Sequence, residues 1–152
     1  MNIGWTEHAR DAFLNAALRG QGGTITWPAG ALYAAALTVN PQTLDVSDMV
    51  EVDSVTHPEY ARVQVEFDAP VTEDIGGPPA TNFRRKCDST AEEIWPDADA
   101  SWGTIVALAF FDAATGGNCW YVRAVATSKD IDEGDTLRAG AGKISISFLN
   151  AA

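Results

Sequence analysis

One stretch of eight residues constrains the fold more than any other part of the chain. In residues 104–111, apolar side chains fill both alternating positions, as expected of a β-strand that is covered on both faces. Residues 112–118 supply turn-forming side chains, including Gly116 and Gly117, and residues 119–127 return as a run rich in β-branched and aromatic residues. The pattern predicts a long central hairpin around which the other strands assemble.

Residues 6–19 predict one helix. Thr6 is suited to the N-cap, Arg19 lies in the last turn and Gly20 follows it. The apolar residues share one narrow, alanine-rich face, and so short a helix is marginal alone. We therefore expect it to lie on its own domain or on a neighbouring subunit.

The remaining chain predicts short strands separated by turns. Strands are expected at residues 31–39, 60–67, 91–95 and 143–149, with exposed connections at residues 42–58, 68–82 and 128–135. Residues 60–67 alternate cleanly, which is typical of a half-buried strand. The expected fold is mainly β: an antiparallel β-sandwich or jelly-roll-like domain with one N-terminal α-helix. We expect one domain over residues 1–152, with a helical arm at 1–23 and the sandwich at 24–152.

Composition excludes some partners. With 10 basic and 21 acidic residues the net charge is −11, which opposes binding to nucleic acid or to an anionic membrane. No signal peptide pattern and no apolar run of about 20 residues is present, so we expect a protein made in the host cytoplasm that does not enter a membrane. Cys87 and Cys119 could form one disulfide, but two buried free thiols are the preferred interpretation.

No pattern typical of an enzyme emerges, and we expect neither catalytic activity nor a cofactor. His8 and His57 have no second ligand at metal-binding spacing, and nucleophile and phosphate-binding motifs are absent from the sequence. The best metal candidate is a calcium site formed by Asp130, Asp132 and Asp135, together with the neighbouring Glu133. Its glycine is out of place for an EF-hand loop, so a solvated turn is preferred.

Two regions are candidates for contacts with other subunits. Arg84, Arg85 and Lys86 hold three of the ten basic residues in one segment. This segment is either a solvated edge strand or a contact with an acidic partner, such as a second copy of the chain, and both alternatives stay open. Trp5, with Phe13 on the following helix, is expected to anchor in another subunit.

The five tryptophans, at positions 5, 27, 95, 102 and 120, allow two interpretations. They could form stacking platforms for sugars. Packing in the core or at interfaces is preferred, because such rings contribute a large buried area.

The segments LYAAALTVNP, YARVQVEF, WPDADASWGTIVALAFFDAATGGN and KDIDEGDTLRAGAGKISISF together resemble a family of small virion proteins of tailed bacteriophages, described as tail-fibre-like or head-decoration proteins. The resemblance extends over most of the chain, from Leu32 to Phe148, and carries no catalytic motif. It implies that the matching positions are scaffold, with Asp112 and Asn118 capping the hairpin.

The resemblance implies a structural protein of the virion. Because the chain has neither heptads nor repeats for a shaft, and its acidity opposes contact with packaged DNA, we expect a decoration (cement) protein on the head exterior. Its expected partners are the major capsid protein and itself, as a homotrimer. The alternative is a tail-associated fibre or receptor-binding module that recognises host surface carbohydrate.

Overall fold

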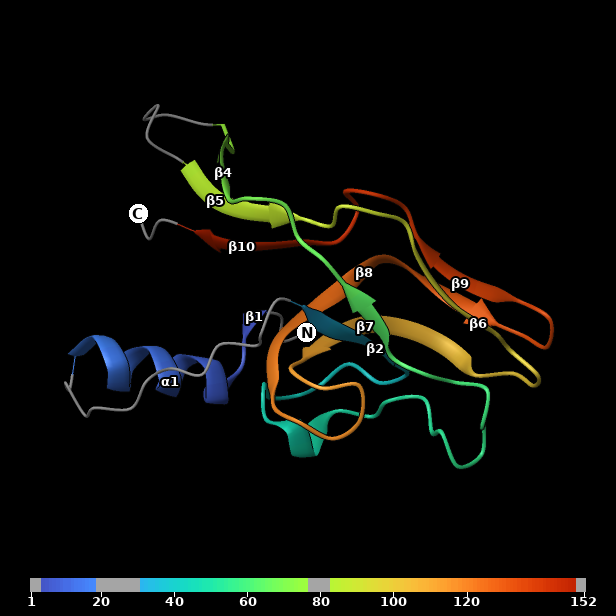
Figure 1. Cartoon of the computed structure of the whole chain (residues 1–152). Coiled ribbons are helices and arrows are strands. Elements are labelled where there is room, and N and C mark those ends of the chain that lie inside the picture. Colours follow the sequence, from blue (N-terminus) through green and yellow to red (C-terminus); the bar gives the residue numbers. More distant parts are fainter. Residues whose placement is uncertain (1–3, 19–30, 77–82, 150–152) are drawn as a thin grey trace.

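The structure is a computed structural model that describes residues 4–18, 31–76 and 83–149; the side chains of residues 17, 18, 83, 148 and 149 are not included in the description. The described part is mainly β, with antiparallel sheets and one α-helix near the N-terminus (Figure 1). The predicted fold class is therefore confirmed. The predicted helix end at Arg19 and Gly20, part of the turn-rich segment at 77–82, and Trp27 lie outside the described residues.

A five-stranded sheet forms the body of the molecule. Its strand order is β1-β8-β7-β2-β3, and every neighbouring pair is antiparallel. The strands are β1 (Gly4–Trp5), β2 (Leu32–Leu37), β3 (Val63–Val65), β7 (Gly103–Phe111) and β8 (Cys119–Ile131). β7 occupies the middle position, so the predicted central hairpin is confirmed. β8 extends beyond residue 127, into a segment predicted to be a connection.

β7 is apolar on both faces because both faces of the five-stranded sheet are covered. Side chains of β7 enter two hydrophobic clusters, one on each face of the sheet. Ile105 joins the same cluster as Leu108 and Phe110, although its parity differs, because the register with β8 shifts between Ile105 and Ala107. This bulge reverses which side of the sheet the odd-numbered residues face.

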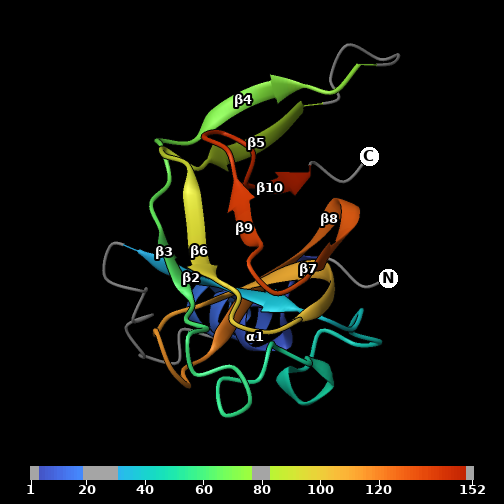
Figure 2. The same cartoon turned by 90° about the vertical axis from the view of Figure 1, so that its right-hand side faces the viewer.

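Two smaller sheets complete the fold. The first is a three-stranded sheet in the order β10-β5-β4, with β4 (Val71–Asp74), β5 (Phe83–Asp88) and β10 (Ser145–Leu149); the second pairs β6 (Glu93–Asp97) with β9 (Thr136–Ala139). Turning the molecule shows the three-stranded sheet extending away from the five-stranded sheet, with β6 and β9 between them (Figure 2).

The larger hydrophobic cluster lies between the layers. It combines alanines of β2 with Trp95 of β6, Leu137 of β9 and Ile144, which precedes β10. The small side chains of β2 therefore allow close approach of a second layer. The opposite face of the sheet is covered by the connection after β2, whose Leu44 and Met49 pack against the second cluster.

Two strands in this half of the fold were not predicted, and the end of a third was predicted too early. Residues 68–82 contain a strand, β4, where only turns were predicted, and β9 was not predicted. β6 continues through Pro96, past the predicted strand end at residue 95. A register irregularity between Ile94 and Asp97 accommodates this residue, which lacks a backbone donor.

Helix α1 (Glu7–Leu18) begins as predicted. The Thr6 hydroxyl accepts a hydrogen bond from the backbone N of Ala9 at 3.3 Å and donates to the Cys119 carbonyl at 2.5 Å. Thr6 therefore caps the helix and also ties its first turn to β8, on which Ala9 is fully buried. No helix in the described ranges has the length and hydropathy of a membrane-crossing segment.

Candidate functional site

The candidate site is a pocket beside the tip of the β7–β8 hairpin. Three parts of the chain form it: residues 51–54 of the connection after β2, Tyr60 and Arg62 just before β3, and tip residues 114–116. We call this the tip pocket. Its volume is about 340 Å³, which lies at the lower end of the range for small-molecule sites.

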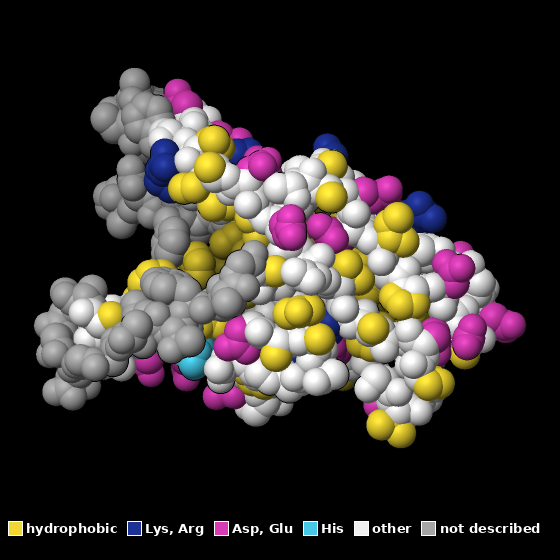
Figure 3. Space-filling view, viewed as in Figure 1, with side chains coloured by type: hydrophobic (Ala, Val, Ile, Leu, Met, Phe, Trp, Pro, Cys, Tyr) yellow, Lys and Arg dark blue, Asp and Glu magenta, His cyan; other side chains and the backbone are white. Residues whose placement is uncertain are grey.

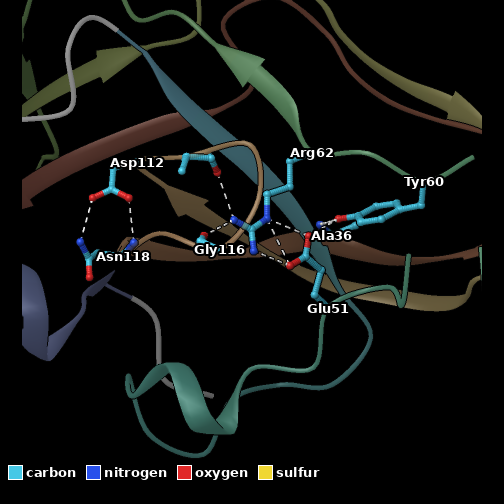
Figure 4. A network of polar contacts seen from close by, with 8 residues as sticks. Ala36, Glu51, Tyr60, Arg62, Asp112, Gly116 and Asn118 are labelled. Atoms are coloured by element: carbon cyan, nitrogen blue, oxygen red, sulfur yellow. Dashed lines mark hydrogen bonds and ion pairs between the residues drawn. The ribbon is translucent and has the colours of Figure 1, made fainter. Parts of the chain in front are cut away.

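Arg62 joins two walls of the tip pocket (Figure 4). On one side its guanidinium forms a bidentate ion pair with Glu51, with 2.7 Å between Nη2 and Oε2 and 2.9 Å between Nε and Oε1. On the other side Nη1 donates to the carbonyls of Ala113 at 3.1 Å and Gly116 at 2.7 Å. The guanidinium carbon also lies 3.6 Å from the centre of the Phe111 ring. A single cation thus holds the hairpin tip against the connection after β2.

Tyr60 connects the same ion pair to the core. Its hydroxyl donates to Oε1 of Glu51 at 2.9 Å and accepts from the backbone N of Ala36 at 2.9 Å. Burial raises the pKa of Tyr60 far above the ordinary tyrosine range, so the hydroxyl stays neutral and keeps its donor role. The ring is buried and packs edge-on against Trp102.

The hairpin tip is held internally by Asp112. Its carboxylate accepts hydrogen bonds from the backbone N of Asn118 at 2.7 Å, from the Asn118 amide at 3.0 Å and from the Trp120 indole at 3.2 Å. Partial burial opposes ionisation, yet these hydrogen bonds outweigh it and lower the pKa of Asp112. The capping pair implied by the family resemblance is therefore present, and Gly116 and Gly117 take the positive φ angles that the turn requires.

The calcium candidates do not converge on one point. Asp130 accepts a hydrogen bond from Thr104, Asp132 accepts one from Ser101 at 3.2 Å, and Asp135 accepts one from the backbone N of Asp132 at 3.1 Å. Glu133 is exposed in the same turn. Within the described ranges, no group of three His, Cys, Asp or Glu residues is arranged to hold a metal ion.

One alternative placed the basic segment, residues 84–86, at the edge of a sheet. β5 is the middle strand of its sheet, so the interpretation as an edge strand is wrong. Glu73 of β4 pairs with both Arg84 and Lys86, the latter at 3.3 Å, because β4 lies beside β5 in antiparallel register. Lys86 also pairs with Asp88 at 2.9 Å, whereas Arg85 donates to neutral oxygens of Thr72 and Pro70. The contact with another subunit stays a prediction.

The aromatic candidates pack largely within the chain. Trp5 contacts Phe13 and Tyr121 edge-on, at centroid distances of 5.7 and 5.2 Å, and remains half-buried. Trp95, Trp102 and Trp120 are buried, so these three rings are core residues, as preferred, and offer no face to a sugar. The cysteines are both free; Cys119 is buried, while Cys87 is only half-buried.

The tip pocket was not predicted from the sequence. Glu51 lies in a segment predicted to be an exposed connection, and Arg62 lies in a segment predicted to be a half-buried strand. Arg62 reaches carbonyls 51 and 54 positions away along the chain. No local pattern encodes such a contact, although Gly116 was recognised as part of a turn.

An antiparallel β domain with a polar pocket suits a structural or ligand-binding module. Residues 4–147 match the model of the family described as podophage GP4 fiber I protein gp80. The chain belongs to this family, and it is a virion protein of tailed bacteriophages with a fibre-like character. No curated protein matches the sequence.

Proposed function

We propose that this protein is a tail-associated fibre component that takes part in recognising carbohydrate on the host surface. The observation that carries the proposal is the family match, which spans residues 4–147 and whose description names a fibre. Capsid decoration, the role expected first from the sequence, receives no support from that description. The family match therefore favours the alternative role.

The surface suits a role outside the particle. Acidic side chains are spread over the face seen in Figure 3, and Lys and Arg occur at few places there. A net charge of −11 opposes contact with packaged DNA and keeps the domain soluble at the periphery. The tip pocket adds a preorganised concave site, as recognition of a small part of a glycan requires.

The location on the virion is tested by immunogold labelling of intact particles with an antibody to this protein. Particles lacking the protein serve as the labelling control and are also heated to measure DNA release. We expect label at the tail and wild-type heat stability of the mutant heads. Label over the head, with DNA release at a lower temperature, would overturn the proposal in favour of decoration and a contact with the major capsid protein.

Assembly as a homotrimer stays part of the proposal. Soluble homo-oligomers mostly adopt closed symmetry, and a closed ring of three copies suits a fibre attachment. Light scattering of the purified chain measures the mass directly. A particle of one or two chains at micromolar concentration would contradict a stable trimer.

A further inference from the structure

We infer that the tip pocket binds a neutral, polyhydroxylated ligand of the sugar class between the two walls that Arg62 ties together. The inference deepens the proposed function and rests on it for its biological role. Its physical basis is separate: two fixed walls, a set of unused polar groups and a local charge that rejects anions.

Both walls are fixed before any ligand arrives. On the first wall, Val52 donates to the carbonyl of Ala36 at 3.0 Å and Glu51 bridges to Leu37 of β2. On the second wall, the two bonds from Arg62 hold the tip carbonyls. A ligand that enters such a site does not have to order a loop, and this lowers the entropic cost of binding.

The lining of the tip pocket includes hydrogen-bonding groups that the fold does not use. Ser54 and Thr115 are exposed, and within the described ranges neither hydroxyl takes part in a hydrogen bond. Each hydroxyl can donate one bond and accept two, which matches the mixed donor and acceptor character of sugar hydroxyls. Other exposed polar residues share these properties, but here two of them face one pocket from opposite walls.

Asp53, which lines the same pocket, adds a fixed acceptor. Its carboxylate accepts from the Val55 backbone N at 2.9 Å and from the Thr56 hydroxyl at 2.6 Å, which orients the turn. These bonds lower the pKa of Asp53, so the group is ionised at neutral pH. A carboxylate has about four acceptor positions, so capacity remains for ligand hydroxyls.

The charge balance of the pocket selects against acidic ligands. Arg62 is matched by Glu51, and no cation within the described ranges forms an ion pair with Asp53. The pocket therefore carries net negative charge on an already acidic protein, which opposes phosphates and carboxylated sugars. The Tyr60 ring is buried, so stacking contributes little and hydrogen bonding dominates.

The test is a nuclear magnetic resonance titration of the full chain, labelled with ¹⁵N. The neutral probes are the methyl glycosides of glucose, galactose and mannose, and N-acetylglucosamine; the acidic probes are glucuronic acid and N-acetylneuraminic acid. We expect at least one neutral probe to shift the amides of residues 53–55 and 114–117, while the acidic probes leave them unchanged.

A double variant, Ser54→Ala with Thr115→Ala, tests whether these two hydroxyls form hydrogen bonds with the sugar. Because each hydroxyl contributes a neutral hydrogen bond, we expect binding to weaken by about fivefold or more, without a change in the unfolding midpoint. The matched control is Thr127→Ala with Ser128→Ala, an exposed pair on β8 outside the pocket, which should bind as the wild type does.

Several results would overturn the inference: no neutral probe shifting the pocket amides, acidic probes shifting them equally, or undiminished binding in the pocket variant. Its failure is distinct from failure of the proposed function. Tail labelling without sugar binding would remove the pocket assignment alone, and sugar binding with head labelling would remove the tail assignment alone.

Discussion

Replacing Tyr60 by Phe tests whether the hydroxyl at the base of the tip pocket holds the fold together. The substitution keeps the buried ring and its edge-on contact with Trp102, but it removes a donor to Glu51 and an acceptor for the backbone N of Ala36. Ala36 is fully buried, so its N–H is left without a partner. A hydrogen bond to a charged group contributes about 1.5–3 kcal/mol, and an unsatisfied buried donor costs about 1–3 kcal/mol.

These two costs overlap, because Glu51 keeps its ion pair with Arg62. We therefore expect Tyr60→Phe to lower the free energy of unfolding by about 3 kcal/mol. Equilibrium denaturation in urea at pH 7, followed by tryptophan fluorescence, measures this difference. The matched control is Tyr33→Phe on β2. Within the described ranges its hydroxyl takes part in no hydrogen bond, so its loss should cost less than about 0.5 kcal/mol.

The pH dependence gives the prediction a second, independent measure. Burial raises the pKa of Tyr60 in the folded state, whereas an unfolded tyrosine ionises near a pKa of about 10. Above pH 10 the unfolded chain therefore holds fewer protons than the folded chain, and stability falls as pH rises. The gap between wild type and Tyr60→Phe should shrink by about 1.4 kcal/mol per pH unit in that range. Equal losses for the Tyr60 and Tyr33 variants at pH 7, or a gap independent of pH above 10, would refute the reasoning.

Three further predictions concern other parts of the fold. In urea denaturation, Gly117→Ala should destabilise the fold more than Gly116→Ala, by about 1 kcal/mol or more. Both glycines have a positive φ angle, but only at Gly117 would the new Cβ lie 2.4 Å from the Asp112 carboxylate. Glu93→Gln should raise the melting temperature at pH 8 and leave it nearly unchanged at pH 4. Burial raises the pKa of Glu93 in the folded state, so the wild type loses stability as pH rises through this raised pKa. In a thiol-labelling time course at pH 8, Cys87 should react before Cys119, whose pKa burial raises to about 12; simultaneous labelling would contradict this order.

The elements that were predicted correctly from the sequence are those that depend on residues close together along the chain. The central hairpin needed only an apolar run, turn residues and a second run, and the capping of α1 by Thr6 needed only the residues beside it. Strand β3 was predicted from alternation, and Val65 is indeed buried while Gln64 and Glu66 are exposed. Such patterns predict secondary structure without any knowledge of tertiary contacts.

The elements that were missed depend on partners far along the chain. β4 has two exposed charged or polar positions and one exposed valine, so its sequence carries no apolar face. It becomes a strand because β5 lies beside it and supplies cations to Glu73. The tip pocket has the same origin, since its walls come from segments that only the folded sheet brings together.

The ion pairs within the basic segment, residues 84–86, limit which of its cations could contact a partner. Arg84 and Lys86 are neutralised by acids of their own sheet, and an acidic partner would have to compete with those pairs. The hydrogen bonds between Lys86 and its acidic neighbours raise its pKa, which is the signature of a cation already satisfied in the folded chain. Arg85 differs, because its contacts are with neutral oxygens and its side chain is exposed. A cluster of three cations in the sequence thus reduces to one cation available to a second subunit, and an electrostatic interface built on this sheet would have to centre on Arg85.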